Sequence, residues 1–333
     1  MSRPAFRVRQ ARVGDLPSLW PLARRLNSYN LPADRRLLAQ LVATSVRSFL
    51  GLVPRPRARY LFVMERWRDR RVVGCSLMIA KHGTPRVPHL RLDRVTIRGR
   101  RALRFGVTTD GPTEVGGLVL LPAFRKHPAH LGRQLSYARL AYLASYPERF
   151  EPEVLVEYLP PLTSSGDSRL WHVLGGPLTG LSYREADRRS ATDKTFILRA
   201  FPRTPIWLDT LPPAVRRDLG RLHPAAAGAC RLLRGIGFRD LRQLEPFDGG
   251  PYYGAQITHI SIIRKVTMGV ISPGSYQNMT RYGLIWTEPR RGDFRAVESA
   301  YRDTSPMLSV SNAALQRLDV RPGDVMYATP LAR

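Results

Sequence analysis

An apolar strand pattern followed by a basic loop and a helix pattern is the feature that most constrains this chain. Residues 113–122 read Thr-Glu-Val-Gly-Gly-Leu-Val-Leu-Leu-Pro, an apolar run with one acidic residue near its start. The loop after it contains Phe124-Arg125-Lys126, and a helix pattern begins at Gly132-Arg133. Backbone amides at the start of a helix carry partial positive charge and bind phosphate groups. The segment therefore predicts a site for a pyrophosphate beside a strand that carries a carboxylate.

Coenzyme A is a ligand that fits such a site, which favours an N-acyltransferase that uses an acyl-CoA thioester. Arg125, Lys126, Gly132 and Arg133 are the candidate contacts to the pyrophosphate and the ribose phosphate. Basic side chains form charge-assisted hydrogen bonds to phosphate oxygens, and a glycine lets the backbone approach closely. The alternative is a basic surface loop without a ligand.

The chain has 333 residues, 43% of them hydrophobic and 9% aromatic, which is typical of a globular protein with one large core or two smaller ones. Its formal net charge is +27, and all but four of its 53 basic residues are arginine. The arginines are scattered over the whole length, and no base-reading motif is present. We therefore expect no nucleic-acid partner. A basic surface would instead steer an anionic ligand such as coenzyme A toward the protein.

Cysteine use, histidine spacing and hydropathy narrow the class of protein further. Cys75 and Cys230 lie far apart in apolar surroundings and are expected to be buried free thiols. The histidines show no metal-ligand spacing, so we expect no metal. No early segment resembles a signal peptide, and no apolar run reaches membrane-spanning length. The expected location is the cytoplasm, with no membrane partner.

Strand and helix patterns alternate along the first two thirds of the chain. Their order is strand, helix, helix, several antiparallel strands, helix, strand and helix, which is the order of the GNAT acyltransferase fold. The fold class is therefore α/β (α+β), a GNAT-like mixed sheet flanked by helices. The expected strands are 6–10, 60–64, 72–80, a hairpin over 91–107, 115–121 and 154–158, and the expected helices include 132–146 and 223–235.

The chain divides into three consecutive parts. Residues 1–200 are expected to form a GNAT-like acyl-CoA-binding core. Residues 201–266 continue it with helices and carry His223 and the turn Phe247-Asp248-Gly249-Gly250-Pro251. Residues 267–333 are expected to form a C-terminal extension that begins with a Gly/Pro/Ser-rich linker and ends in a small β-rich lobe.

Many of these segments resemble a known family, the arginine N-succinyltransferases of bacterial arginine catabolism. Each short motif alone would be weak, but their common order extends over nearly the whole chain. The matching segments are Leu31-Pro32-Ala33-Asp34; Glu114–Pro122 with Phe124-Arg125-Lys126; Gly132 with Leu135-Ser136 and Arg139; Val156-Glu157; Trp171 with Leu174-Gly175; Arg184 with Ala186-Asp187; His223-Pro224; Gly237-Phe238-Arg239; Phe247–Pro251; Ile263-Arg264-Lys265; and Gly323-Asp324.

The resemblance implies transfer of a succinyl group from succinyl-CoA to the α-amino group of L-arginine, or of a related amino acid such as ornithine. Succinyl-CoA would be a co-substrate, and no prosthetic group is implied. The family's proton donor falls on His223. A backbone contact to succinyl-CoA falls on Leu118, whose side chain then simply belongs to the core. Family members commonly assemble from more than one chain, so we expect an oligomer, with small molecules as the other partners.

The reaction requires a neutral amine, a stabilised oxyanion and a proton for the departing thiolate. His223 suits proton donation, because imidazole titrates near neutral pH and the start of a helix disfavours its charged form. Its alternative role is that of a helix-capping or core histidine. Glu114 suits a base that acts through water, or an anchor for the incoming ammonium. Its alternative role is that of a strand-edge carboxylate paired with an arginine.

Three segments differ from the family pattern. His127–Leu131 lengthens the phosphate loop, Tyr158-Leu159-Pro160 replaces a Met-Arg-Gly step, and Ser164-Ser165 replaces an acidic pair. The last two changes concern the acceptor, because a guanidinium normally meets carboxylates in a fork geometry.

Glu157, Asp187 and Asp248 remain as candidate contacts to the acceptor, although Asp248 also suits a purely local role in its turn. Two other hypotheses stay open. One is an acyl-CoA N-acyltransferase with a different acceptor or acyl group. The other is a non-catalytic relative that binds coenzyme A or nucleic acid.

Overall fold

The computed structural model describes residues 5–26, 28–85, 87–190, 193–273 and 279–331. They form two compact units, each with a hydrophobic core of its own. The first unit takes the residues up to 80, residues 115–150 and those from 257 onward, and the second takes 81–114 and 151–256. Strand β6 (Thr113–Leu120) begins in the second unit and continues in the first.

The N-terminal part of the first unit is a sheet. β1 (Phe6–Gln10), β2 (Arg59–Arg66) and β3 (Val72–Ile79) are antiparallel neighbours, and β6 lies next to β3. Every residue of β3 is buried, as are all but the end residues of β2. Burial on both sides of a strand indicates a sheet that is covered on both faces.

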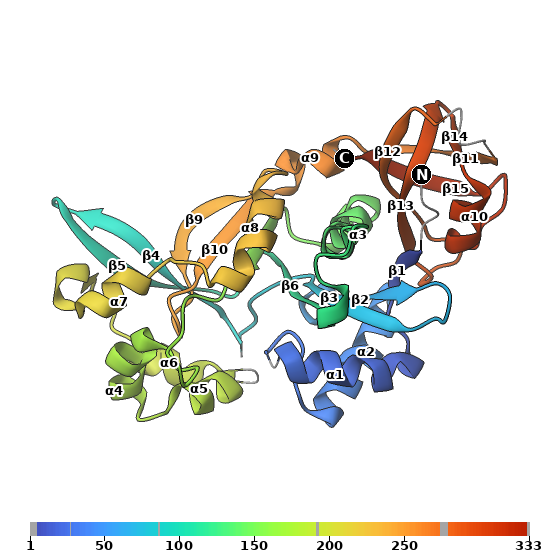
Figure 1. Ribbon diagram of the computed structural model, residues 1–333. Helices are drawn as coiled ribbons and strands as arrows, with labels where there is room; N and C mark the ends of the chain where they lie inside the picture. The colour runs from blue at the N-terminus through green and yellow to red at the C-terminus, as the bar shows by residue number, and fades with distance from the viewer. Residues whose placement is uncertain (1–4, 27, 86, 191–192, 274–278, 332–333) are drawn as a thin grey trace. The chain divides into compact units, whose positions relative to one another are not determined.

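Helices supply that cover. α1 (Leu16–Leu26) and α2 (Arg35–Phe49) pack on one face of the sheet, and α3 (Leu131–Ser145) packs on the other (Figure 1). Asp34 caps α2, because its side chain accepts a hydrogen bond from the Leu37 amide. The core between the first two helices and the sheet includes Leu19, Leu22, Leu38, Val42, Leu61 and Leu77.

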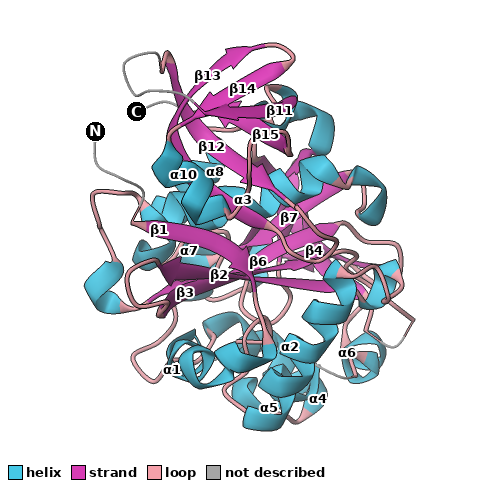
Figure 2. Cartoon of the chain, turned by 90° about the vertical axis from the view of Figure 1, so that its right-hand side faces the viewer, coloured by secondary structure: helices cyan, strands magenta, loops and turns pink. Residues whose placement is uncertain are grey.

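Five strands close into a ring in the C-terminal part of the first unit (Figure 2). Each of them pairs with two others of the five, and α10 (Asn312–Leu318) packs on the ring. One of them also pairs with β1, which joins the ring to the N-terminal sheet. The strands are β11 (Thr267–Pro273), β12 (Arg281–Thr287), β13 (Arg295–Thr304), β14 (Met307–Val310) and β15 (Val325–Pro330), and the short helix α9 (Ser261–Arg264) precedes them.

The second unit contains an antiparallel sheet whose strands lie in the order β7, β10, β9, β4, β5 and β8. Helices α4 to α7 cover the β4–β5 end of this sheet, where Leu92, Leu103, Trp171, Ile197 and Phe201 share one core. The elements are β4 (His89–Ile97), β5 (Arg100–Thr108), β7 (Glu153–Glu157), a π-helical turn (Trp171–Gly175), α4 (Gly176–Thr179), α5 (Tyr183–Ser190), α6 (Thr195–Ala200), β8 (Ile206–Trp207), α7 (Pro213–Asp218), α8 (Ala227–Arg234), β9 (Arg239–Leu244) and β10 (Pro251–Gln256).

The structure confirms the α/β class and most of the predicted elements, including the strand, loop and helix from Thr113 onward. Cys75 and Cys230 are buried free thiols, as expected. The linker expected from about Met268 is wrong at its start, because Met268 lies in β11 and pairs with β15. The rest of that linker, 274–278, lies outside the described residues. β13 is a strand that the sequence analysis did not predict.

The two units cut across the three consecutive parts expected from the sequence. The second unit is built from two separate stretches of the chain, 81–114 and 151–256. Between them, residues 115–150 with most of β6 and all of α3 belong to the first unit, as do the residues from 257 onward. Within each unit, residues that are close in space are therefore distant in sequence.

Candidate functional site

A kink in β6 precedes the expected phosphate loop. Gly117 has a φ of 59°, a region that favours glycine, and a Cβ there would lie 3.0 Å from the Cβ of Leu77. The buried Arg139 of α3 donates a hydrogen bond of 3.0 Å to the carbonyl of Gly116 and so ties the helix to the strand. Leu118, the expected backbone contact to the acyl-CoA, follows directly after this kink.

The loop after β6 leads to a helix start where the sequence predicts one. His130 has a left-handed backbone with a φ of 50°, and α3 begins at the next residue, Leu131. The His130 carbonyl accepts a hydrogen bond of 2.8 Å from the amide of Arg133, so the chain is helical from its first turn. A loop that turns abruptly into a helix directs the first amides of that helix outward, which is the arrangement that binds phosphate.

The four candidate phosphate contacts differ in their exposure and in the hydrogen bonds that they already make within the protein. Arg125 and Lys126 are exposed, and the first of these donates a hydrogen bond of 3.3 Å to the main chain of β6. A Cβ at Gly132 would meet nothing closer than 3.8 Å. Arg133 donates two hydrogen bonds, 3.0 and 2.7 Å long, to the buried carboxylate of Glu298. Its charge is therefore largely matched within the protein.

A hollow of about 390 Å³ lies beside the same loop. The guanidinium carbons of Arg70 and Arg317 lie 3.6 and 4.4 Å from the ring centre of Trp67. The loop therefore borders a surface that is both cationic and aromatic. The lining residues are Ala5, Phe6, Arg66, Trp67, Arg68, Phe124, His127 and Arg317.

His223 caps the short helix Pro224–Ala226 in the second unit. Its Nδ1 accepts a hydrogen bond of 3.1 Å from the Ala225 amide, and its own amide donates one of 2.8 Å to the carbonyl of Leu159. Because Nδ1 accepts, the neutral ring carries its proton on Nε2. His223 therefore has the helix-capping role that the sequence analysis gave as its alternative. This role leaves Nε2 of the neutral ring with an N–H.

Two carboxylates lie in or next to the Phe247–Pro251 turn: Asp248 within it and Glu245 just before it. Asp248 accepts a hydrogen bond of 2.7 Å from the amide of Gly250, and Glu245 accepts hydrogen bonds from the amides of Phe247 and Asp248. A Cβ at Gly250 would lie 2.3 Å from the carbonyl oxygen of Tyr158, so only glycine fits there. The local role weighed for Asp248 is therefore real, but the turn also concentrates negative charge.

Four carboxylates from three segments of the second unit act on one another. Burial, with the charges of Glu245 and Asp248, raises the pKa of Glu157 well above its ordinary value. Burial, with the charge of Asp187, raises the pKa of Asp248 to about 7. Burial raises the pKa of Glu245 and of Asp187 as well. Like charges at short range cannot all ionise at once, so this group holds protons at neutral pH.

The same group is open to a ligand. Glu157 and Asp187 are in contact with solvent although protein surrounds them, and Asp248 is half-buried. Lys194 is a neighbouring cation, and its charge lowers the pKa of three of these carboxylates. We call Glu157, Asp187, Glu245 and Asp248 the acidic group. A cationic ligand that bound there would stabilise the ionised carboxylates and release protons.

Glu114 belongs to the same neighbourhood, because its charge contributes to the raised pKa of Glu157. It is buried at the start of β6, opposite Leu155 of β7. Its Oε2 atom lies 3.7 Å from Nδ1 of His82, so a histidine accompanies it. The parallel pairing of β6 with β7 covers only two positions.

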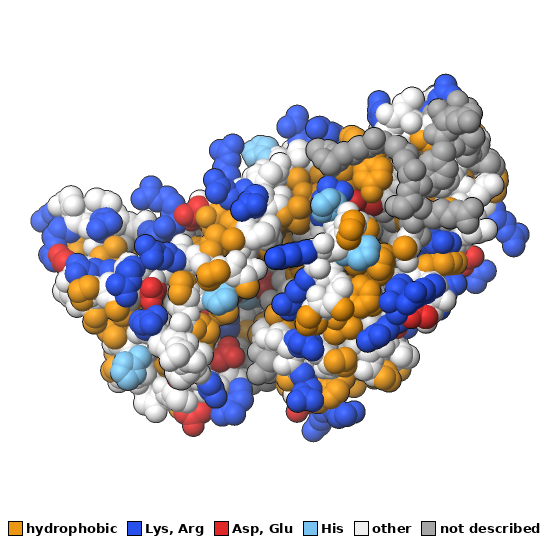
Figure 3. All heavy atoms as spheres, viewed as in Figure 1, with side chains coloured by type: hydrophobic (Ala, Val, Ile, Leu, Met, Phe, Trp, Pro, Cys, Tyr) orange, Lys and Arg blue, Asp and Glu red, His pale blue; other side chains and the backbone are white. Residues whose placement is uncertain are grey.

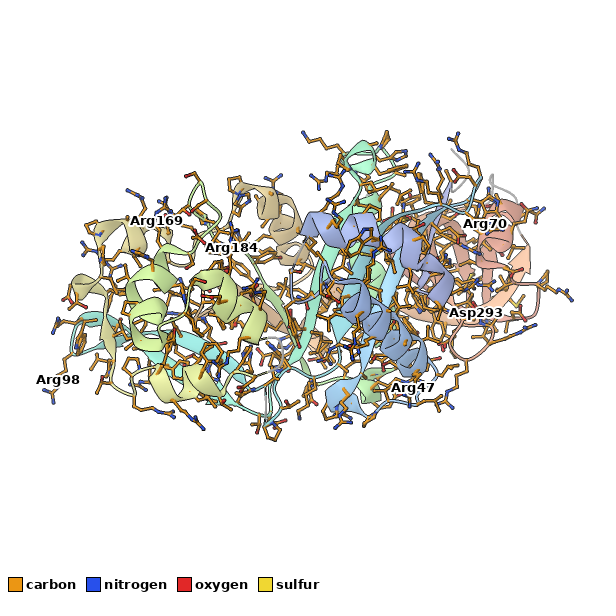
Figure 4. All side chains as sticks on the ribbon, turned by 90° about the horizontal axis from the view of Figure 1, so that it is seen from below. Arg47, Arg70, Arg98, Arg169, Arg184 and Asp293 are labelled. Carbon is orange, nitrogen blue, oxygen red and sulfur yellow. The ribbon has the colours of Figure 1, made fainter. Side chains whose placement is uncertain are left out.

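Two of the segments that differ from the family pattern contact elements that carry the acidic group. Tyr158-Leu159-Pro160 contacts the Phe247–Pro251 turn through the Tyr158 amide, which donates to Pro251. Ser164-Ser165 lies in an exposed turn, where Ser165 donates to Asp167 at 2.8 Å. Arg184 on α5, labelled in Figure 4, donates to the Ser165 carbonyl at 2.7 Å. The turn thus still carries one carboxylate.

Basic side chains are dispersed over the face shown in Figure 3 rather than gathered over one element. In the described part of the chain, no helix is long and apolar enough to span a membrane. Within the same residues, no group of three or more histidine, cysteine, aspartate or glutamate side chains is arranged to hold a metal ion.

The structure brings four sequence candidates, Glu114, Glu157, Asp187 and Asp248, into one neighbourhood of the second unit. Leu118, Arg125, Lys126, Gly132 and Arg133 lie in the first unit, and His223 lies in the second. Sequence reasoning missed Glu245, Lys194, Tyr183, His82 and His89. The spacing of Glu245 and Asp248 within one turn could have indicated the first of these. The others reach the group only through tertiary structure.

Comparison with known proteins decides the family. The model of the family described as arginine N-succinyltransferase beta subunit matches residues 6–262. The chain belongs to the arginine N-succinyltransferase family.

The arginine N-succinyltransferase of Enterobacter sp. (strain 638) is 26% identical over 96% of both chains. The arginine N-succinyltransferase subunit alpha of Pseudomonas aeruginosa is 29% identical over 87% of this chain and 89% of its own. The solved structure of arginine/ornithine succinyltransferase subunit AI from Pseudomonas aeruginosa has a TM-score of 0.83 and 24% identity. It covers 99% of this chain and 100% of its own, and it confirms the fold.

Replacing Gly132 by alanine tests the phosphate loop. Because nothing lies within 3.8 Å of the new Cβ, and alanine favours helix over glycine by up to about 1 kcal/mol, the thermal midpoint should be unchanged or slightly raised. Affinity for coenzyme A, measured by calorimetry, should fall about tenfold or more if a phosphate approaches this backbone. Gly228→Ala, also in a helix with open space around it, is the matched control and should leave affinity unchanged. Equal affinity in both variants would remove Gly132 from the site.

Replacing Asp248 by asparagine tests the acidic group. A carboxyl whose pKa is raised to about 7 in the folded protein contributes stability at low pH that is lost as pH rises from about 4 through 7. Asparagine keeps an acceptor for the Gly250 amide and has no such loss. Because the site is partly solvated, the variant should be more stable by about 1–2 kcal/mol at pH 8. It should match wild type near pH 4, as measured by urea unfolding. A pH-independent difference would contradict the shift.

Proposed function

We propose that the protein transfers the succinyl group of succinyl-CoA to the α-amino group of L-arginine or of a related amino acid such as ornithine. The observation that carries the acceptor half is the acidic group of the second unit. Glu157 and Asp187 are exposed, Asp248 is half-buried and Glu245 is buried, and burial raises the pKa of all four carboxyls. Family membership supports the reaction type.

The acidic group suits a dicationic acceptor better than a neutral one. Arginine brings a guanidinium and an ammonium, both of which pair with carboxylates, and a guanidinium accepts two oxygens in one plane. Glu157, Asp187 and Asp248 are the proposed contacts, and Tyr183, which hydrogen bonds to Asp248, helps to orient that carboxylate. A bound cation would replace the protons on these carboxylates with ion pairs. The most basic ligands should therefore bind most tightly.

The chemistry follows from the groups at hand. The ammonium must lose a proton before its nitrogen can attack the thioester carbon, and Glu114 is the proposed acceptor of that proton or the anchor of the amine. Attack forms the C–N bond and places negative charge on the carbonyl oxygen. Collapse breaks the C–S bond, and His223 is the proposed donor of a proton to the departing sulfur through its Nε2–H.

The first unit supplies the proposed binding site for succinyl-CoA. Arg125 and Lys126 are exposed cations next to a helix start, and Gly132 leaves room for a phosphate at the first turn. Arg133 would contribute only by sharing its charge between a phosphate and Glu298. Leu118 is the proposed backbone contact to the pantetheine arm. No prosthetic group is needed for this reaction, and the cytoplasm, with arginine catabolism as its setting, is the proposed location.

Thiol release from succinyl-CoA tests the function directly. Arginine should stimulate release with succinyl-CoA, and less with acetyl-CoA, above a blank without acceptor. Ornithine and lysine test the range of amines. Citrulline, with a neutral ureido group in place of the guanidinium, should lower kcat/KM by about 100-fold or more, because the carboxylates of the acidic group would lose their cationic partner.

His223→Ala should lower kcat by about 10²–10⁴-fold. His172→Ala, at an exposed histidine of the same unit, should not. Release that is independent of any amine would contradict the proposal. Binding of coenzyme A without release would favour a non-catalytic relative. Efficient turnover with a neutral acceptor would favour a different acceptor.

We also propose that the chain assembles with at least one further chain. The support is that the Pseudomonas aeruginosa proteins are named as subunits. Light scattering after size-exclusion chromatography of the protein alone should give a mass of at least twice 37.6 kDa. A monomer at micromolar concentration would contradict self-assembly. Co-expression would then test assembly with a different chain.

A further inference from the structure

A hollow beside the phosphate loop takes no part in the chemistry proposed above, and we call it the Trp67 hollow. Its volume is about 390 Å³, which lies in the range of about 300–1,000 Å³ that small-molecule sites occupy. Trp67 and Arg68 line it from the turn between β2 and β3, Phe124 and His127 from the loop after β6, and Phe6 from β1. All of these residues belong to the first unit, so one folded body forms the hollow.

The Trp67 hollow lies near the start of α3, where the pyrophosphate is proposed to bind. β1 pairs antiparallel with β13, and their register carries Glu298 of β13 to the end of β1 where Phe6 lies. Arg133, in the first turn of α3, donates a hydrogen bond of 2.7 Å to Glu298. Phe6 in turn packs edge-on against His127, with 5.1 Å between the ring centres. The helix start and the hollow are therefore neighbours, and one ligand can reach both.

Aromatic rings give the hollow an apolar wall. Phe6 is buried and packs edge-on against Phe124, with 6.1 Å between the ring centres. Phe124 and Trp67 are only half-buried, so parts of both side chains face solvent. Half-exposed rings favour a flat ring system as a ligand, because stacking and edge-to-face contacts remove apolar area from water. A nucleobase is such a ring system.

Positive charge gathers around Trp67. The guanidinium carbons of Arg70, Arg317 and Arg7 lie 3.6, 4.4 and 5.0 Å from the centre of its ring, and Arg70 is labelled in Figure 4. The buried Glu65 accepts hydrogen bonds of 3.1 and 2.8 Å from Arg70 and Arg7. Burial and the charge of Arg70 nevertheless lower the pKa of Arg7 to about 10. These cations repel one another in spite of the carboxylate, which favours an anionic ligand nearby.

Arg68 supplies an exposed cation in the lining of the hollow. Its charge acts on Asp69, but Asp69 accepts its hydrogen bond of 3.0 Å from Arg66. Within the residues that the structure describes, the Arg68 side chain makes no hydrogen bond. Its guanidinium therefore keeps its N–H groups for a ligand, and a phosphate can accept two of them at once.

We propose that the Trp67 hollow binds the adenosine 3′-phosphate end of the acyl-CoA co-substrate, with the base against the aromatic wall and the 3′-phosphate on Arg68. The proposal rests on the proposed function, which supplies the acyl-CoA and places its pyrophosphate at the start of α3. These contacts are distant from the thioester and the same before and during the reaction. They should therefore lower KM for the co-substrate and leave kcat unchanged.

Fluorine NMR of protein labelled with 5-fluorotryptophan locates the nucleotide without any turnover. The signal of Trp67, assigned through Trp67→Phe, should shift when adenosine 3′,5′-bisphosphate is added. Adenosine, which lacks both phosphates, should shift it only at much higher concentration. Trp20 on α1 is the control, because a guanidinium also lies over its ring, 4.7 Å from the centre, and its signal should not move. A Trp67 signal that stays fixed when coenzyme A saturates the protein would overturn the proposal.

Calorimetry with coenzyme A and 3′-dephospho-coenzyme A tests the phosphate contact. Wild type should bind coenzyme A about tenfold or more tightly, and Arg68→Ala should reduce this ratio to about threefold or less. Because Arg68 is exposed, its removal should leave the thermal midpoint unchanged.

Arg47→Ala is the matched control for that experiment. Arg47, labelled in Figure 4, is exposed and lies in the last turn of α2, which contacts the start of β2, whereas Trp67 follows the end of β2. Arg47→Ala should keep the wild-type ratio of the two affinities. Equal affinities in wild type, or a ratio that Arg68→Ala leaves unchanged, would refute the proposal.

Thiol release separates this proposal from the proposed function. Arg68→Ala should raise KM for succinyl-CoA by about tenfold and leave kcat within about twofold of wild type. If wild type released no thiol with any amine, the proposed function would fail, while the two binding measurements would still decide the role of the hollow. If Arg68→Ala lowered the mass found by light scattering and left both affinities unchanged, the hollow would be a contact between chains and the proposal would be wrong.

Discussion

The mutual repulsion of the four carboxylates of the acidic group is the constraint on which the proposed chemistry depends. Folding places Glu157, Glu245 and Asp248 near one another, with Lys194 as a neighbouring counter-charge, and their raised pKa values measure how unfavourable full ionisation is. A site of this kind opposes stability at neutral pH but gains free energy when a cation arrives. Under the proposed function, the free energy lost on folding would be recovered when a basic acceptor binds. Sites that bind a charged ligand commonly have this character, because the ligand completes the charge balance.

The first unit shows the opposite arrangement. Its buried arginines are matched inside the protein: Arg133 by Glu298, and Arg139 by main-chain carbonyls and Ser136. The cations that remain exposed at the loop, Arg125 and Lys126, stand at a helix start that attracts anions. Each unit therefore has a local group of charges, the exposed cations at the loop in the first and the acidic group in the second, that suits one of the two proposed substrates, an anionic thioester and a cationic amine. β6 carries Leu118 and Glu114 on a single strand, so one element contributes to both.

The sequence predicted the local features well. Two such features are the strand, loop and helix from Thr113 to Ser145 and the glycine turn at Phe247–Pro251. Both depend on residues that are adjacent along the chain, and hydrophobic periodicity and turn residues indicate structure of this local kind. The same reasoning predicted a linker where β11 lies, because Gly269 and Pro273 are typical of loops. In the structure, pairing with the neighbouring strands of the ring makes this segment a strand. It also missed His82, His89 and Lys194. These residues come near Glu114 and the acidic group only through tertiary contacts, which no spacing in the sequence records.

The overall charge of the protein and the charge of its acidic group have opposite signs, and the two act over different ranges. A net charge of +27 attracts a CoA thioester from a distance but repels arginine. Salt screens such forces over about 8 Å at physiological ionic strength, whereas buried pairs are screened much less. Under the proposed function, the acceptor would therefore be selected only on contact with the acidic group, where local carboxylates outweigh the distant arginines.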